Sequence, residues 1–171
     1  MSRLLRIFRW LGGGIGILAA VALAVFLYAP YADGPVGPLG YIAGGRLHGP
    51  VEVFPDDPSA WADQLTVELE TNPTDPRSVT VGLLVVDGVA FVPATLRPDT
   101  KRWPRDVERD ANVRVRVDGR IYRARATRIR DLRLHERLAN AGQHKYDPSY
   151  FDSERTWFYR LDAPNAAQVG S

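Results

Sequence analysis

The residues of this chain best suited to bind a charged group are the arginines of one short segment. The stretch VRVRVDGRIYRARA (113–126) alternates apolar and basic side chains around Asp118-Gly119. An Asp-Gly pair between β-rich runs predicts a two-residue type I′ turn, which would place Arg114 opposite Arg123. The outward face of this hairpin then carries Arg114, Arg116, Arg123 and Arg125. Such a face can bind an anionic ligand or be neutralised by carboxylates.

Two sources of negative charge could satisfy this face. Arginines directly opposite each other repel, so we expect an acidic partner near Arg114 and Arg123. One source is internal, because Glu68 and Glu70 share one face of a predicted strand; the other is external, such as a lipid headgroup, an envelope polymer or a cofactor phosphate. Residues 33–96 hold 2 basic and 9 acidic side chains, whereas residues 97–137 hold 14 basic and 7 acidic ones. The two halves can offset each other, which favours the internal pairing.

No other residues have the spacing of a catalytic or metal site. The chain has no cysteine, and His48, His135 and His144 lack metal-ligand spacing, so we expect them in surface or capping roles. The acidic residues Asp147, Asp152 and Glu154 lack the ligand order of a calcium loop. No serine lies in a G-x-S-x-G motif, and the glycine-rich GIGILA (14–19) lies inside an apolar run, not after a strand. The sequence therefore predicts no catalytic and no metal-binding residues.

The N-terminal 32 residues differ in composition from the remainder. From Trp10 to Ala32 there are 23 residues without a charge, preceded by three arginines and followed by Asp33. At about 1.5 Å per residue, such a helix can cross the roughly 30 Å hydrocarbon layer. The positive-inside rule places the N-terminus in the cytoplasm. We therefore expect a single-pass anchor (1–32) in the cell inner membrane with an extracytoplasmic C-terminal domain. The competing interpretation, a signal peptide cleaved near Ala24, is less favoured because the run exceeds the usual apolar region.

The overall charge does not indicate a nucleic-acid partner. Three of the 22 basic residues precede the apolar run, so 19 basic and 20 acidic residues follow it. A nearly neutral domain lacks the basic surface that nucleic-acid binding requires. The expected partner is the membrane, through the N-terminal helix. Gly12 and Gly16 form a G-x-x-x-G pattern, so a weak homodimer could form through these glycines or through the barrel.

Hydrophobic periodicity divides the rest of the chain into short elements. Residues 33–50 contain six glycines and three prolines and form a linker or lead-in, residues 51–163 form the domain, and residues 164–171 form a disordered tail. Strands are predicted at 64–71, twice within 78–94 around Asp87-Gly88, in the arginine hairpin and at 156–162. A short helix begins near Pro104, and a second is capped by Asp131 and closed by Gly142. The predicted fold is mainly β (α+β): a transmembrane helix, then a small antiparallel split β-barrel with one or two short helices.

The pattern of these elements resembles a known superfamily. The run VELET…PRSVTVGLLVVDGVAFVPA…KRWPRDVERDANVRVRVDGRIYRARATRI, covering residues 64–130, resembles the split-barrel flavin-binding superfamily. That group includes pyridoxamine-phosphate-oxidase-like and deazaflavin-dependent nitroreductase-like proteins. The resemblance implies FMN or the deazaflavin F420 as cofactor. It also implies phosphate and ring contacts at Arg77, Ser78, Lys101, Arg102 and Trp103.

Two functions follow from these observations, and enzyme activity is left open between them. The favoured one is a membrane-anchored extracytoplasmic domain that binds a ligand or partner without catalysis, because no catalytic constellation is present. The alternative, implied by the resemblance, is an FMN- or F420-dependent oxidoreductase. Lys101 and Arg102 support this alternative, since a helix N-terminus flanked by cations attracts anions such as a cofactor phosphate.

Overall fold

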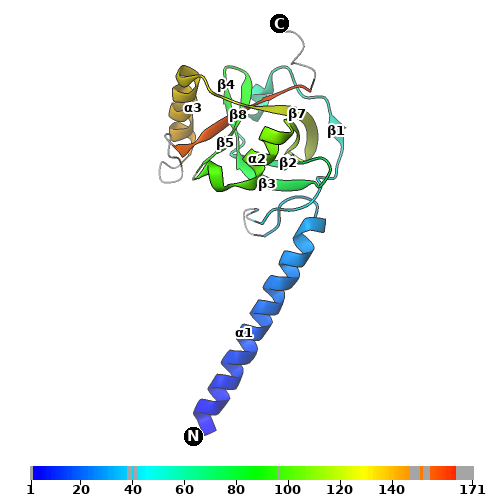
Figure 1. The fold of residues 1–171 in the computed structure, drawn as a ribbon, viewed down its shortest axis with the longest axis vertical. Helices are drawn as coiled ribbons and strands as arrows, with labels where there is room; N and C mark the ends of the chain where they lie inside the picture. The colour runs from blue at the N-terminus through cyan, green and yellow to red at the C-terminus, as the bar shows by residue number, and fades with distance from the viewer. Residues whose placement is uncertain are drawn as a thin grey trace.

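A long helix and a curled sheet make up the protein, seen here in a computed structural model (Figure 1). The structure describes residues 2–37, 40, 42–95, 97–146, 151 and 155–164, with side chains of the first helix described from residue 15 onward. Helix α1 (Ser2–Tyr28) extends away from the sheet and continues into η1 (Ala29–Tyr31). Among the residues described, no helix has the length and apolar character needed to span a bilayer.

The described strands form one curled, mostly antiparallel half-barrel. Its strand order is β3-β2-β6-β7-β8-β5-β4, with β1 paired in parallel to β7. The curl brings β3 back toward β5. The two strands are so close that a Cβ on Gly82 would lie 3.1 Å from the Pro93 ring. The strands are β1 (Val51–Glu52), β2 (Thr66–Thr71), β3 (Arg77–Gly82), β4 (Leu84–Val86), β5 (Val89–Ala94), β6 (Asn112–Val117), β7 (Arg120–Arg128) and β8 (Trp157–Asp162).

Short helices complete the fold: η3 (Pro58–Trp61), η4 (Pro98–Thr100), α2 (Arg102–Arg109) and α3 (Leu132–Lys145). In Figure 1, α2 lies beside β2 and β3, and α3 lies on the opposite side, next to β4 and β8. The predicted mainly β fold with antiparallel pairing and a few short helices is confirmed.

The arginine hairpin has the predicted register. Arg114 pairs with Arg123 and Val115 with Tyr122, and Asp118 and Gly119 form the turn with φ of +48° and +76°. Both positions need the left-handed region, which Asp-Gly tolerates. The predicted cap of α3 is also present, because the Asp131 carboxylate accepts the Leu134 N–H at 2.8 Å. These features depend on neighbours close in sequence, which is why pattern alone predicts them.

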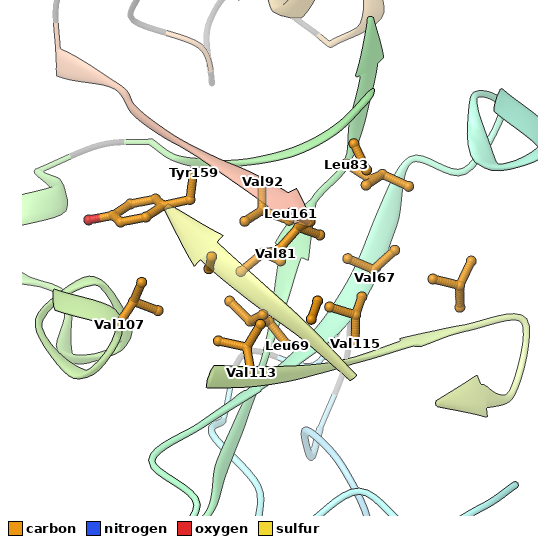
Figure 2. Packing of buried hydrophobic residues seen from close by; sticks show 14 of the residues in the cluster. Val67, Leu69, Val81, Leu83, Val92, Val107, Val113, Val115, Tyr159 and Leu161 are labelled. Atoms are coloured by element: carbon orange, nitrogen blue, oxygen red, sulfur yellow. The ribbon is translucent and has the colours of Figure 1, made fainter. Parts of the chain in front are cut away.

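Two apolar clusters lie on opposite faces of the sheet. The larger one fills the inside of the curl, where Leu69, Val115 and Tyr159 are fully buried (Figure 2). The smaller one lies under α3 and includes Phe158 and Leu138. Adjacent Phe158 and Tyr159 are therefore both buried, although successive side chains of a strand point to opposite faces. The reason is that α3 covers the second face of β8.

Three predicted details are wrong. The segment before Asp87 is not one strand, because it breaks at Leu83 into β3, which pairs with β2, and β4, which pairs with β5. The strand predicted at 64–71 begins only at Thr66, and Leu65 before it is 58% exposed. Gly142 does not end α3, which continues to Lys145. Gly142 lies inside the helix because Phe151 packs there; a Cβ would lie 2.2 Å from its ring.

Tyr146 fills the break between β3 and β4. Its hydroxyl accepts the Leu83 N–H at 2.7 Å and can donate to the carbonyl of Leu83 at 2.7 Å or of Leu65 at 2.9 Å. Burial raises the pKa of this phenol to about 12 from its ordinary 10.0, although the Leu83 N–H opposes the rise. The next residue back, Lys145, donates to the Ala62 and Gln64 carbonyls, both at 2.7 Å. The end of α3 therefore holds the turn before β2 against the strand break.

We expect Tyr146→Phe to lower the free energy of unfolding by about 1–2 kcal/mol, because main-chain groups at the break lose a partner. In the wild type the folded pKa exceeds the unfolded one, so this phenol's contribution is complete below pH 10 and declines as the pH rises toward 12. Urea unfolding of both proteins between neutral pH and pH 12 measures this. If the difference in unfolding free energy between the two proteins stays constant up to pH 12, the Tyr146 hydroxyl does not make the hydrogen bonds described.

The glycine-rich segment before β1 is packed on the outer face of β2 and β6. Leu47 is fully buried, and Gly44 exchanges backbone hydrogen bonds with Ser78 of β3 at 2.9 and 3.1 Å. The Gly45 N–H donates to Ala32 at 3.1 Å, which returns the chain to the end of η1. We call this segment, residues 33–50, the lead-in. Its packing decides which outward side chains of the sheet remain accessible.

Candidate functional site

Glu70 and Glu68 lie beside the outward arginines of β6. Glu70 is paired in register with Arg114 and Glu68 with Arg116. Arg114 lies 3.0 Å from the Glu70 carboxylate, and Arg116 contacts Glu68 and lies 2.7 Å from Asp33. The predicted internal pairing is confirmed for Arg114. Glu68 pairs with Arg116 and not with Arg123, the other arginine for which an acidic partner was predicted.

Each ion pair also holds one residue of the lead-in by its backbone. Glu70 accepts the Leu47 N–H at 2.7 Å, and Arg114 donates to the Leu47 carbonyl at 3.0 Å. In the same way, Asp33 accepts the His48 N–H at 2.9 Å, and Arg116 donates to the His48 carbonyl at 3.3 Å. These charges therefore attach the lead-in to the sheet, and they are not free to bind a ligand.

The pKa of Asp33 reflects its contacts with His48 and Arg116. Burial alone would raise its pKa, but the His48 N–H and the Arg116 guanidinium outweigh burial and lower it. At Arg116, burial would lower the pKa, but the hydrogen bonds that its guanidinium donates to Glu68 and Asp33 outweigh burial, and the pKa is raised. Both shifts favour the charged forms that make the contacts.

Asp33→Asn should lower stability by less than about 1 kcal/mol, because the carboxylate is about half exposed and solvent screens the pair. The folded pKa of Asp33 is lowered, so its contribution is present above the ordinary value of 3.8 and disappears as the pH falls below it. Thermal unfolding of both proteins from pH 7 to pH 3 tests this, since their transition temperatures should converge at acidic pH. An undiminished difference at pH 3 would assign the effect to something other than the Asp33 charge.

Arg123 and Arg125 of β7 differ from the arginines of β6. Within the described part of the chain, neither guanidinium has an ion pair or hydrogen bond. Arg123 is exposed and lies opposite Arg114, while Arg125 lies between Asn112 and Asp162 in the sheet. The four predicted anion-face residues thus divide into two that fix the lead-in and two without a counter-ion.

A separate cleft of about 980 Å³ follows the edge strand β3. Its lining comes from Pro35, Gly40 and Ala43 of the lead-in, from the start of α2, from parts of β2 and β3, and from the β6–β7 turn. The charged side chains along it are Glu68, Lys101, Arg102, Arg116 and Asp118.

Lys101 is the cation of this cleft without a partner. It is half-buried at the residue before α2, and its ammonium group makes no hydrogen bond or ion pair with any described residue. Burial lowers its pKa. The first turn of α2 has no side-chain cap, so main-chain N–H groups there lack a side-chain acceptor. An anion in the cleft could satisfy both the ammonium group and the helix terminus.

The other predicted cofactor residues are engaged elsewhere. Arg102 lies 3.5 Å from Asp75 and 3.5 Å from the buried Asp106, which also lies 3.2 Å from Arg109; the Asp106 contacts are ion pairs without hydrogen-bond geometry. Trp103 is only 6% exposed, and its ring packs on Tyr159 at 5.1 Å. Lys101, Arg102 and Trp103 all line the cleft.

Arg77 and Ser78 begin β3 outside the cleft lining. Ser78 is fully buried beneath Gly44 of the lead-in, and its hydroxyl has no partner among the described residues. For a flavin, the cleft therefore offers Lys101 to a phosphate group, but Trp103 is turned into the core and Ser78 is covered. These residues fit an anionic group better than they fit an isoalloxazine ring.

Two of the three histidines have polar neighbours in the structure. His135 contacts the Thr156 carbonyl at 3.0 Å, and His48 lies 3.8 Å from Asp33. No group of three metal-ligating side chains occurs among the residues that the structure describes. The predicted acidic group at Asp147, Asp152 and Glu154 falls outside them.

Residues missed by the sequence reasoning come mostly from the lead-in. Pro35, Gly40 and Ala43 line the cleft, and Arg46 lies beside Arg114 and Arg123. The density of glycines in residues 33–50 was the available signal, because glycine allows close approach of two backbones as well as flexibility.

Several solved structures resemble this chain at low sequence identity. A protein of Listeria innocua provisionally named a pyridoxamine 5′-phosphate oxidase is 15% identical, with 62% of this chain and 89% of that chain covered and a TM-score of 0.47. A conserved hypothetical protein of Mycobacterium tuberculosis is 16% identical (66% and 86% covered, TM-score 0.49). HutZ, a haem storage protein of Vibrio cholerae, is 14% identical (61% and 86% covered, TM-score 0.49).

The sheet is a curled, mostly antiparallel half-barrel, in agreement with the split-barrel fold expected from the sequence. At these identities the likeness concerns the fold alone. No protein-family model and no curated protein matches the sequence.

Proposed function

We propose that this split barrel is a membrane-anchored, extracytoplasmic domain that binds an anionic ligand in the cleft beside Lys101 without catalysis. The observation that carries the proposal is the half-buried ammonium group of Lys101, which has no partner within the described residues and lines a cleft of about 980 Å³. Burying a cation without a partner is unfavourable, and a bound anion would remove that cost.

The anchor is proposed from the sequence. The uncharged run from Trp10 to Ala32 follows three arginines, and these arginines orient the N-terminus toward the cytoplasm. Described side chains of α1 support the proposal, because Leu18 and Phe26 are each 71% exposed on a helix directed away from the domain (Figure 1). Exposed apolar side chains of this kind need a covering environment.

An oxidoreductase with FMN or F420 is the second candidate. The size of the cleft favours it, since ligand pockets commonly measure about 300–1,000 Å³. When bound, either cofactor would supply hydride transfer. Lys101 would hold its phosphate group, and the remaining predicted ring contacts are unfavourable because Trp103 packs on Tyr159. Non-catalytic binding is therefore the proposal.

Titration of the full-length protein in detergent separates the two functions. FMN, F420 and haem are each added while visible absorbance is recorded, and small phosphate and carboxylate anions are added while thermal unfolding is followed. Binding of an anion without a coloured stoichiometric complex supports the proposal. A yellow one-to-one complex with either flavin would establish the cofactor function instead, and no binding of any compound would reject both.

Lys101→Met should weaken anion binding in the cleft about tenfold, because one charge-assisted hydrogen bond is lost. The fold should be retained, since Lys101 holds no other residue by its side chain within the described region. Arg105→Gln is the matched control, because Arg105 is an exposed cation on the same helix and lies outside the cleft lining. Equal weakening by both variants would indicate general electrostatic attraction and not a site at Lys101.

Topology has its own measurement. A reporter enzyme active only outside the cytoplasm, fused after the C-terminus, should be active, and the protein should remain in the membrane after alkaline extraction. Activity of a cytoplasm-only reporter would overturn the proposed location while leaving the cleft unaffected.

A further inference from the structure

A second recess lies between the lead-in, the loop after β2 and the β6–β7 hairpin. Its volume is about 390 Å³. Arg46 comes from the lead-in, Arg114 from β6 and Arg123 from β7. The loop closes it at Pro73, whose carbonyl accepts a hydrogen bond from Arg46 at 3.2 Å. Three guanidinium groups thus converge from segments far apart in the sequence.

The charges in this recess do not balance. Glu70 is the acidic residue of its lining, and both of its oxygens are used by Arg114 and the Leu47 N–H. Arg46 contacts only a carbonyl, and Arg123 contacts no polar group of the described chain. Two guanidinium groups therefore remain without a carboxylate.

Three other arginines of the same hairpin have counter-ions, whereas Arg125, like Arg123, has none among the described residues. Arg116 contacts Glu68 and Asp33, Arg120 lies 3.3 Å from Glu52, and Arg128 lies 3.7 Å from Glu108. In contrast, Arg123 lies directly opposite Arg114 in the sheet, where like charges repel. An anion placed between Arg46 and Arg123 would relieve this repulsion.

We propose that this recess binds a phosphate group, with Arg123 and Arg46 as its ligands and Arg114 as the fixed cation behind them. Guanidinium groups match phosphate oxygens geometrically and pair with them by charge-assisted hydrogen bonds. The site is distinct from the cleft at Lys101, since the two share no lining residue. The phosphate could belong to a lipid headgroup or be free in solution.

The position of Arg46 bears on the lipid source. Arg46 follows Gly45, whose N–H donates to Ala32 just after η1, so the recess begins where α1 ends. If α1 is a membrane anchor, as proposed above, this places Arg46 near the headgroup layer. Anionic phospholipids attract cationic side chains at that depth.

The test uses the full-length protein in uncharged detergent micelles, with thermal unfolding followed by tryptophan fluorescence. Inorganic phosphate is compared with chloride at equal ionic strength, and micelles containing phosphatidylglycerol are compared with micelles containing phosphatidylcholine. We expect a saturable rise in Tm with phosphate groups, about tenfold weaker binding in Arg123→Gln, and a larger loss when Arg46→Gln is added. Arg120→Gln, which removes an equal charge from the same hairpin, should bind as the wild type does.

The comparison of inorganic phosphate with phosphatidylglycerol identifies the source of the bound phosphate group, and the variants can overturn the proposed site. A response to phosphatidylglycerol alone identifies a lipid headgroup, and a response to inorganic phosphate as well identifies a site for free phosphate. No response to either, or an equal response in Arg123→Gln, overturns the proposal. Lys101→Met separates this site from the cleft, because the part of the phosphate response that Arg123→Gln removes should persist in Lys101→Met, even if the proposed cleft function fails.

Discussion

Glu70→Gln is expected to lower the free energy of unfolding by about 3–5 kcal/mol, which is the cost of breaking a buried ion pair by removing one charge. The Glu70 side chain is 4% exposed and joins Arg114 to the Leu47 N–H. Without its charge, Arg114 remains half-buried beside Arg123 with no carboxylate. Urea unfolding of the full-length protein, followed by tryptophan fluorescence, measures the loss.

Two further variants test whether this loss of stability is specific to the buried ion pair. Glu52→Gln removes the same charge from an exposed pair with Arg120 and should cost less than about 1 kcal/mol. Combining Glu70→Leu with Arg114→Leu should recover part of the loss, because no unpaired charge is then left buried. A loss for Glu70→Gln as small as that for Glu52→Gln would show that the pair does not fasten the lead-in.

Gly44→Ala is the second change with a large expected effect, about 3 kcal/mol or roughly 10 °C in Tm. A Cβ on Gly44 would lie 1.7 Å from the Gly34 carbonyl oxygen, so two backbones would have to separate. The same displacement would break the exchange of hydrogen bonds between Gly44 and Ser78. Differential scanning fluorimetry gives the shift in Tm.

Gly16→Ala is the matched control. Its Cβ would meet nothing within 4 Å, and alanine favours a helix over glycine. We therefore expect no loss of domain stability in this variant. A Gly44→Ala protein with an unchanged Tm would mean that the lead-in is not packed against itself at that point.

Local patterns predicted what depends on neighbouring residues. The register of the arginine hairpin followed from the conformational needs of Asp118-Gly119, and the cap of α3 followed from the short side chain of Asp131. The pairing of Glu70 with Arg114 could be inferred because opposite charges were concentrated in different halves of the chain. In each case the physical preference is expressed within a few residues or in overall composition.

Features that depend on distant packing were not predictable in the same way. The strand is interrupted at Leu83 because the chain changes its pairing partner there: β3 pairs with β2, whereas β4 pairs with β5. No local residue signals that change. Gly142 is the residue type that commonly ends a helix, but here it lies inside α3, where Phe151 packs against it. The burial of both Phe158 and Tyr159 likewise requires α3 on the second face of the sheet.

The candidate site shows the same division. Lys101 and Trp103 were named from the resemblance, and both line the cleft, but the pattern could not show that Trp103 packs on Tyr159. It also could not show that Ser78 lies under Gly44, because glycine-rich segments are read first as flexible. The prediction that Gly12 and Gly16 support a dimer stays a prediction.

The packing of the lead-in has a practical consequence for proteolysis and truncation. Ala29 and Ala32 are nearly inaccessible, and Gly45 lies so close to Pro30 that no side chain fits between them. A fragment cut at residue 33 would lose these contacts, and one cut at residue 51 would also uncover Glu70 by removing Leu47. The smallest autonomous folding unit should therefore begin at Ala29, directly after the end of α1. Proteases should cleave within α1 before they cleave the glycine-rich lead-in.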